Sequence, residues 1–229
     1  MKRIRRAYSK TVSLIDETAV QIYQSFVGKK KGFLLESYDK NNGRYVFMGK
    51  NPEEVIKSKE NGLVIEKADG TTKELSGNPV DLLKGYYSDF EIRKDDEQLA
   101  FTGGLVGGLG YDFVRYKEEL PDNNPDEIGI STISLMLVTE FLSIDHFAET
   151  MTAVVVEDDT EAGREKAMFR CEEMVKEAFA NIRKDEKSEF QPDGKIIKQS
   201  DTLEEYSEKV NKIKQYIICL LYTSPSPRD

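Results

Sequence analysis

A polar pair that ends an apolar run has the clearest potential for binding chemistry in this sequence. Leu34-Leu35 is followed directly by Glu36 and Ser37, a pattern typical of a strand that presents a carboxylate and a hydroxyl at its exit. Arg44 follows across a predicted hairpin and could supply a cation for a ligand carboxylate. We therefore expect Glu36, Ser37 and Arg44 to form a site for a small ligand. The alternative is a strand end with its cap.

A glycine-rich segment, 101–112, is where phosphate chemistry would be sought, because glycines let backbone N–H groups close on an anion. Gly103 and Gly108 have the outer spacing of a P-loop, but Leu109 stands where that motif needs lysine. Gly108-Leu109-Gly110 also lacks the third glycine of a dinucleotide motif. We interpret the segment as a strand whose glycines admit another backbone or a bulky side chain.

Other reactive residue types occur without the partners that catalysis needs. His146 is the single histidine and lies beside Asp145 at a predicted hairpin turn, without a nucleophile for which it could act as base. Cys171 lies near the apolar face of a predicted helix, where a buried thiol is expected. With Cys219 as the second cysteine, the chain has neither a disulfide framework nor a metal knuckle.

Composition excludes several classes of protein. The chain has 229 residues, with 33 Lys plus Arg against 42 Asp plus Glu and a net charge of -9, so nucleic acid is not an expected partner. Hydrophobic residues make up 38%, but no apolar run approaches the roughly 20 residues that cross a bilayer. The basic N-terminus is followed by an amphipathic stretch and not by the apolar core of a signal peptide. We expect a globular cytoplasmic protein.

The elements that must position these residues alternate short strands with a few helices. Because no strand–helix–strand repeat is visible, the pattern predicts an α+β fold of antiparallel sheets flanked by helices. Hairpin turns are expected at 41–43, 68–70 and 145–149, and a charged loop at 93–97. Strands are predicted over 33–37, 44–49, 55–57, 63–67, 71–75, 133–144 and 151–157, and helices over 16–27, 79–90, 160–182 and 202–217.

The chain changes character twice near its end. Residues 183–200 are charged and contain Pro192 and Gly194, which is typical of a linker between domains. Residues 219–229 read CLLYTSPSPRD directly after a helical pattern, and this string resembles one reading frame of a transposon-derived sequencing adapter. We therefore expect 219–229 to be an artefact that belongs outside any reasoning about the fold. The alternative is a natural tail rich in serine and proline.

Several motifs together resemble the N-terminal region of the anthranilate synthase component I family. Residues 33–37 and 43–49 are similar to the family's LLES and GRYSFIG segments, and 144–146 to its strand-end FDH. Residues 101–116 resemble its F-x-GG-x-VGY-x-GYD-x-VR block, except that Gly108 stands where tyrosine is usual.

The resemblance continues to about residue 218. Residues 200–217 are similar to the entry into the family's catalytic domain, which then continues with a GDIFQ-type segment. The resemblance thus implies an N-terminal regulatory domain over 1–182, a linker over 183–200 and, over 201–218, the first helix of a catalytic domain that is otherwise missing.

The resemblance also implies a function for the complete protein. Members of the family convert chorismate and ammonia to anthranilate and pyruvate in tryptophan biosynthesis, with Mg2+ and with a glutamine amidotransferase subunit, component II, that releases the ammonia. Tryptophan inhibits them through the LLES motif, which maps onto Glu36 and Ser37, with Arg44 as a nearby cationic contact. The chorismate and Mg2+ ligands lie in the catalytic domain. We therefore expect this fragment alone to be inactive, to bind no Mg2+ and to expose apolar sheet surface.

Two alternatives remain open. Aminodeoxychorismate synthase component I has a similar fold and uses the same substrate, although the LLES run favours the anthranilate enzyme. A non-catalytic amino-acid-binding module would fit if the tail at 219–229 were natural.

Overall fold

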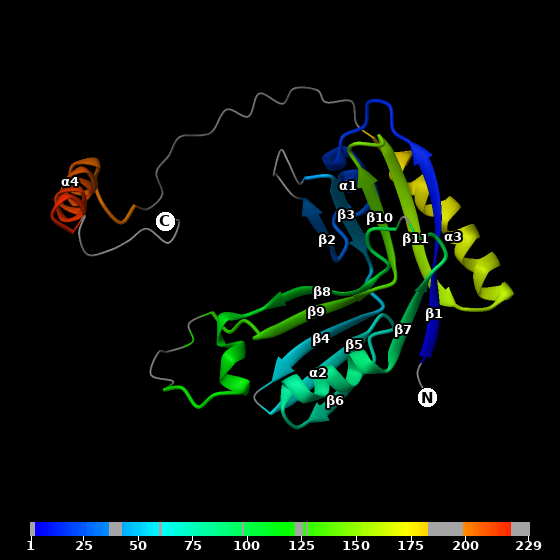
Figure 1. The fold of residues 1–229 in the computed structure, drawn as a ribbon, viewed down its shortest axis with the longest axis horizontal. Coiled ribbons are helices and arrows are strands. Elements are labelled where there is room, and N and C mark those ends of the chain that lie inside the picture. The colour runs from blue at the N-terminus through cyan, green and yellow to red at the C-terminus, as the bar shows by residue number, and fades with distance from the viewer. Residues whose placement is uncertain are drawn as a thin grey trace. The chain divides into compact units, whose positions relative to one another are not determined.

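The computed structural model describes residues 3–36, 43–59, 61–97, 99–121, 126, 128–182 and 199–220 (Figure 1). The chain divides into two compact units, residues 1–184 and 185–229. The first unit contains every strand of the described residues. The architecture confirms the predicted α+β class.

One sheet of the first unit has six strands. Neighbouring strands are antiparallel except for one parallel pair at an edge, between the first and seventh strands of the chain. In spatial order the sheet runs β2 (Gly32–Glu36), β3 (Tyr45–Lys50), β10 (Glu140–Asp145), β11 (Thr150–Asp158), β1 (Arg3–Ser13) and β7 (Phe90–Lys94).

The other sheet has five strands, all antiparallel to their neighbours. Its order is β6 (Thr72–Ser76), β5 (Gly62–Lys67), β4 (Glu54–Lys59), β9 (Ile133–Val138) and β8 (Gly104–Leu109). The 3-10 helix η1 (Tyr111–Tyr116) follows β8.

The prediction of one strand over 133–144 was wrong. The chain leaves the five-stranded sheet at Val138 and enters the six-stranded sheet at Glu140, with Thr139 between them. Both halves carry large buried apolar side chains. Because the run is apolar both before and after Thr139, its periodicity does not show where the chain passes from one sheet to the other.

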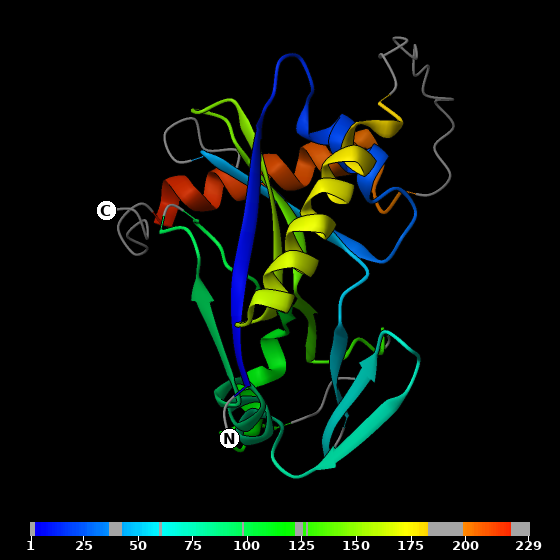
Figure 2. The same cartoon turned by 90° about the vertical axis from the view of Figure 1, so that its right-hand side faces the viewer.

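Two helices cover one face of the six-stranded sheet, α1 (Ala19–Phe26) and α3 (Glu161–Ala180) (Figure 2). The sequence sets where they begin, because Thr18 and Gln21 form a capping box before α1 and the Thr160 hydroxyl accepts from the backbone N–H of Gly163 in α3. Between helices and sheet lies a core that includes Ile22, Phe26, Met48, Leu142, Cys171 and Met174.

A second core occupies the opposite face of the six-stranded sheet, where residues of both sheets meet. It includes Phe141 and Val154 from the six-stranded sheet, Val106 and Val138 from the five-stranded sheet, and Leu99 from the loop after β7. α2 (Pro79–Ser88) packs near β5 and is capped by Asn78, whose side chain accepts from the backbone N–H groups of Val80 and Asp81.

Two strands were missed. β1 lies in the interior of the six-stranded sheet, although no strand was predicted there, and β7 extends to Lys94 within the predicted charged loop 93–97. The charges misled the prediction because several of them pair with residues far away in the chain. Arg5 Nη1 lies 2.7 Å from Glu53 Oε2, and Arg93 Nη1 lies 3.2 Å from Asp159 Oδ2.

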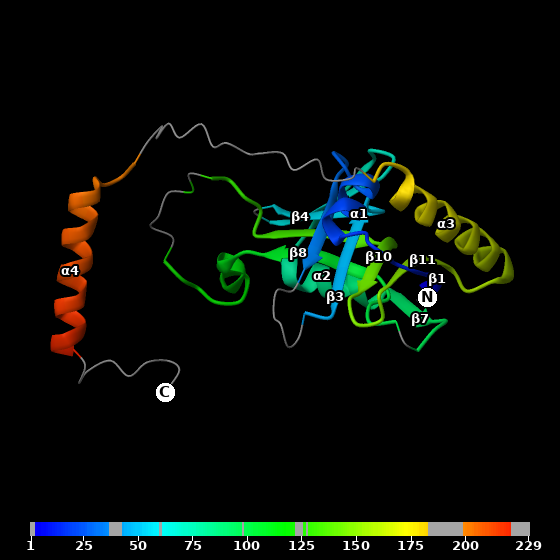
Figure 3. The same cartoon turned by 90° about the horizontal axis from the view of Figure 1, so that it is seen from above.

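The second unit contains α4 (Leu203–Leu220), which Figure 3 shows as one continuous helix. The Thr202 hydroxyl accepts from the backbone N–H of Glu205 at 3.3 Å, and the Glu205 carboxylate accepts from the backbone N–H of Thr202. This arrangement confirms the capping of the predicted helix 202–217. Residues 183–198 of the predicted linker and 221–229 of the predicted artefact lie outside the described residues.

Candidate functional site at the ends of β2 and β3

Glu36 is the last residue of β2 and is exposed. It pairs with Val46 of β3, which belongs to the core beneath α1 and α3. Directly paired residues of antiparallel strands share one face, so the Glu36 side chain lies on the helix-covered face of the sheet. Among the described residues, the carboxylate of Glu36 has no hydrogen-bond or ion-pair partner. Ser37 lies outside the described residues.

Arg44 precedes β3 and binds the carboxylate of Asp145 at the end of β10. Its Nη2 lies 2.6 Å from Oδ2 of Asp145, and its Nε lies 3.0 Å from each of the two carboxylate oxygens. The guanidinium also lies 4.9 Å from the ring centroid of Tyr45 and 5.9 Å from that of Phe147. The chain at this point is held further by the backbone N–H of His146, which donates to the carbonyl of Arg44 at 2.9 Å.

Asp145 is the electrostatic centre of this arrangement. Hydrogen bonds from Arg44 lower the pKa of its carboxyl below the ordinary value, and the backbone N–H groups of Ala148 and Phe147 add to the effect. The carboxylate therefore both fixes the arginine and closes the turn between β10 and β11.

The structure does not bring Glu36 and Arg44 together. Asp145 of β10 pairs with Tyr45 of β3. The preceding residue of β10, Ile144, lies in the core beneath the helices. Side chains alternate along a strand, so Asp145 and the guanidinium it binds lie on the face opposite to Glu36. That Glu36, Ser37 and Arg44 share one ligand stays a prediction.

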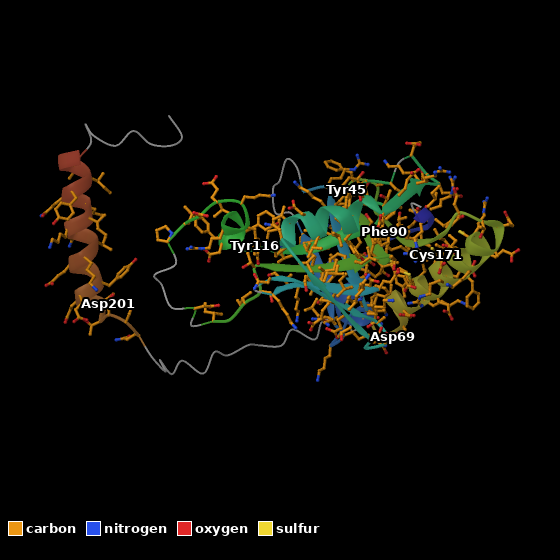
Figure 4. All side chains as sticks on the ribbon, turned by 90° about the horizontal axis from the view of Figure 1, so that it is seen from below. Tyr45, Asp69, Phe90, Tyr116, Cys171 and Asp201 are labelled. Carbon is orange, nitrogen blue, oxygen red and sulfur yellow. The ribbon has the colours of Figure 1, made fainter. Side chains whose placement is uncertain are left out.

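Sequence reasoning missed a groove on the Asp145 side of the sheet. Its volume is about 480 Å3. Hydroxyl side chains of adjacent strands line its floor, where the Oγ1 atoms of Thr11 and Thr152 lie 2.9 Å apart. Tyr45, labelled in Figure 4, is one of its aromatic residues. The signal in the sequence is the alternation of polar residues at Ser143 and Asp145 within an apolar strand, but only the register shows that Ser143 pairs with Thr152.

The glycine-rich segment is structural, as predicted. A Cβ atom at Gly107 would lie 2.1 Å from the carbonyl oxygen of Ser134 in β9, and one at Gly103 would lie 2.8 Å from that of Val138. These positions need glycine because a neighbouring backbone approaches them closely. Glycine at position 107 therefore allows β8 to pair with β9.

Cys171 is buried, as predicted. It lies on α3 (Figure 4), has no exposed surface, and its Sγ contacts the carbonyl oxygen of Ala153 at 3.5 Å. Burial raises the pKa of the thiol to about 12. A group in this state is neither a nucleophile nor a metal ligand at neutral pH.

Metal-ligating residues do not gather in the part of the chain that the structure describes. No three His, Cys, Asp or Glu side chains there could hold one ion. The described residues therefore do not fit a Mg2+ site. Within the same residues, no helix is both long and apolar enough to cross a membrane.

Comparison with known proteins identifies relatives. The sequence model of a family described as "chorismate binding enzyme" matches residues 31–218. Anthranilate synthase component 1 of Acetivibrio thermocellus is 33% identical over 141 residues, which cover 61% of this chain and 28% of the relative. The Pseudomonas aeruginosa protein of the same name is 28% identical over 212 residues, which cover 88% of this chain and 43% of the relative.

A solved structure is also similar in part. The crystal structure of anthranilate synthase component I from Streptococcus pneumoniae TIGR4 is 23% identical, with a TM-score of 0.46 over 72% of this chain and 36% of that chain. The chain thus spans less than half the length of each of these relatives. Because the family match covers most of the sequence, the chain belongs to the chorismate-binding enzyme family, and its relatives within it include anthranilate synthase component 1.

Proposed function

We propose that the chain is the N-terminal part of an anthranilate synthase component I. The complete protein would convert chorismate and ammonia to anthranilate and pyruvate in the cytoplasm. The similarity to anthranilate synthase component 1 along 88% of the chain carries this proposal. The conversion belongs to the longer protein, in which Mg2+ and the chorismate ligands would lie beyond residue 218.

The first unit would serve in regulation. We assign residues 1–182 to a tryptophan-binding domain, 183–200 to a linker and 201–218 to the first helix of the catalytic domain. Component II would supply ammonia from glutamine. The fragment by itself would form no product, because it would lack nearly all of the catalytic domain.

Tryptophan would bind at Glu36 and Ser37, with Arg44 nearby. The exposed Glu36 carboxylate supports this assignment, because it has no partner among the described residues and can accept from a ligand ammonium group. Arg44 lies on the opposite face of the sheet from Glu36, and Nη1 is its one guanidinium nitrogen that Asp145 does not engage. Binding there would inhibit by favouring one conformation of the complete protein, a coupling of binding free energies between two sites.

The reaction is tested with the complete gene product and with this chain in parallel. Each is mixed with chorismate, Mg2+ and an ammonium salt, and anthranilate is followed by its fluorescence while pyruvate is assayed separately. We expect both products from the complete protein, inhibition by tryptophan, and no product from the chain alone. Accumulation of aminodeoxychorismate without pyruvate would instead assign the sister enzyme. Tryptophan binding without any turnover by the complete gene product would assign a binding module.

The inhibitor site is tested in the same assay with Glu36→Gln and Ser37→Ala. Loss of one charge-assisted hydrogen bond should raise the inhibition constant about tenfold without changing uninhibited turnover. Glu165→Gln, which changes an exposed carboxylate on α3, is the matched control and should leave inhibition unchanged. Unchanged inhibition in Glu36→Gln would remove Glu36 from the site.

A further inference from the structure

A small cavity lies where α2 meets edge strands of the two sheets. Its volume is about 110 Å3. An engineered apolar cavity of about 150 Å3 takes up benzene, so this space has the size for a molecule with a single ring. Three elements and the segment before β8 line it: Tyr86 and Tyr87 of α2, Phe90 and Ile92 of β7, residues 102–105, and Leu137 of β9.

Two glycines leave this space open. Gly103 and Gly104 have φ values of +93° and +127°, which favour glycine. Gly104 is buried, yet a Cβ atom there would meet no atom within 4 Å. Protein interiors are close-packed and seldom leave such space beside a buried residue. The backbone therefore forms one wall of the cavity, and the volume that a side chain would fill is left for a ligand.

The aromatic wall of the cavity is fixed in position by the fold. The Tyr86 hydroxyl donates to the carboxylate of Glu54 at 2.6 Å, and Glu54 is itself buried. The ring centroids of Tyr86 and Phe90 lie 5.1 Å apart, with an angle of 48° between the ring planes. Phe90, which is labelled in Figure 4, begins β7. Rings held in this way can pack against an aromatic ligand without first being ordered by it.

The cavity has an opening and a polar group. Tyr87 lines it and is 63% exposed, so the cavity reaches the surface at this residue. Thr102 also lines it and is half-buried. Among the described residues, the Thr102 hydroxyl has no hydrogen-bond partner. A hydroxyl can both donate and accept, so Thr102 can bind one polar substituent of a ligand.

The cavity differs in charge from other hollows of the first unit. The groove on the Asp145 side also includes Arg44 and Asp96, and a hollow between β5 and β6 includes Lys59 and Glu74. Of the described residues that line the cavity beside α2, none is charged. An unpaired charge is costly to bury, so the ligand of this cavity is neutral. Tryptophan and chorismate, which carry carboxylates, are therefore unsuited to it.

We propose that this cavity binds a neutral molecule with one aromatic ring and one hydrogen-bonding substituent, the chemical class of the phenols. The ring would lie against Tyr86 and Phe90, and the substituent would reach the hydroxyl of Thr102. Because β7 belongs to the six-stranded sheet and β8 to the five-stranded sheet, the ligand would contact both sheets. The proposal goes beyond the proposed function and needs neither chorismate nor tryptophan.

Binding is tested with 4-fluorophenol and the whole chain. The fluorine resonance of the ligand broadens when the ligand exchanges with a protein site, and a titration gives the dissociation constant. A ligand of this size makes few contacts, so we expect saturation with a dissociation constant of about 1 mM. 4-Fluorobenzoate has the same ring but a negative charge and should bind at least about tenfold more weakly. Absence of saturation, or equal binding of the two ligands, would overturn the proposal.

Matched tyrosine variants locate the ligand. Tyr87→Ala removes the ring at the opening and should weaken the binding of 4-fluorophenol about fivefold. Tyr111→Ala is the control, because Tyr111 lies on η1, is 96% exposed and does not line the cavity. This control should leave the dissociation constant unchanged. Equal dissociation constants for the two variants would place the ligand elsewhere and contradict the proposal.

A third variant tests the polar contact. Thr102→Val keeps the shape of the side chain but removes its hydroxyl. It should weaken the binding of 4-fluorophenol about fivefold and leave the binding of fluorobenzene, which lacks the polar substituent, unchanged. Circular dichroism checks that each variant is folded. An equal loss for both ligands would overturn the assignment of the Thr102 hydroxyl, and none of these measurements depends on the enzyme assay.

Discussion

Arg44 and Asp145 join two segments that are 101 residues apart in the chain. The guanidinium binds both carboxylate oxygens, with Nη2 2.6 Å from Oδ2, and so ties the start of β3 to the turn between β10 and β11. Because Glu36 pairs with β3 at Val46, the ion pair lies next to the strand end that carries the proposed inhibitor site. The region around this site is thus held by a specific contact.

Asp145 should stabilise the first unit through two separate contributions. Asp145→Ala removes the acceptor for the backbone N–H groups of Phe147 and Ala148, which lie 3.0 and 3.2 Å from Oδ1. Loss of these two hydrogen bonds should lower the free energy of unfolding, measured with urea, by about 1–2 kcal/mol. Asp145→Asn keeps an acceptor for the turn but loses the charge, so it should destabilise less than Asp145→Ala. Equal losses would assign the whole effect to the ion pair.

The charge contribution of Asp145 has a defined pH dependence. Arg44 holds the pKa of the Asp145 carboxyl below its ordinary value of 3.8. Such a group stabilises the folded state fully above its unfolded pKa, and this stabilisation is lost as the pH falls through the folded pKa. The stability difference between the parent chain and Asp145→Asn should therefore be constant near neutral pH and shrink below about pH 4. A difference that grew in acid would contradict the assignment.

Lys50 should contribute more to stability than an exposed lysine. Its side chain is 4% exposed, and its Nζ donates to the carbonyl of Phe26 at 2.7 Å and pairs with the Glu177 carboxylate of α3. Lys50→Met keeps most of the volume but leaves both acceptors without this donor, which should cost about 1–3 kcal/mol. Lys10→Met is the control, because Lys10 pairs with Glu172 at the surface. This substitution should lower the free energy of unfolding by less than about 1 kcal/mol. Urea unfolding of both variants gives the comparison, and similar losses would rule out a special role for Lys50.

Gly107 and its neighbour form a matched pair for testing the close approach of β8 and β9. Gly107→Ala would place a Cβ atom 2.1 Å from the carbonyl oxygen of Ser134, at a φ of +154°. The strands must then shift, which should destabilise the chain by about 2–3 kcal/mol. Gly108→Ala meets no atom within 4 Å and should change stability by less than about 0.5 kcal/mol. Thermal unfolding that ranked the two variants in the opposite order would refute the packing described for β8.

Cys171 should react with thiol reagents only after unfolding. With a pKa of about 12, roughly one molecule in ten thousand would carry the thiolate at pH 8, and the side chain is fully buried as well. In a Cys219→Ser variant, a disulfide reagent should therefore titrate no thiol in the native chain and one in urea. Rapid labelling of the native variant would show that α3 opens readily from the sheet.

Local patterns predicted most of the architecture. The strand at 44–49, the hairpin turn at 145–149 and the helix after Thr160 are confirmed, because turn residues, alternation and caps act over short distances. β1 was missed because its charged residues are accommodated by partners far away in the chain. Arg6, for example, binds Asp159, with Nε 2.7 Å from Oδ1. No local pattern contains such a pair.

The candidate site was predictable only in part. The sequence placed Glu36 at a strand exit, and the structure confirms that position. The sequence could not reveal that Arg44 binds Asp145 on the face of the sheet opposite to Glu36, because that contact depends on the pairing of β3 with β10. The hydroxyl groups of Thr11 and Thr152 likewise lie together because of the register in which β1 pairs with β11. Their spacing in the sequence does not indicate this contact.

The central claim is that this chain is the N-terminal part of a longer anthranilate synthase subunit. The most direct test is to amplify the source DNA again and sequence it across the codon for Ile218. We expect the reading frame to continue into a GDIFQ-like segment and a further catalytic domain in place of residues 219–229. A confirmed Ser/Pro-rich tail followed by a stop codon would contradict the account and make a non-catalytic binding module the leading interpretation.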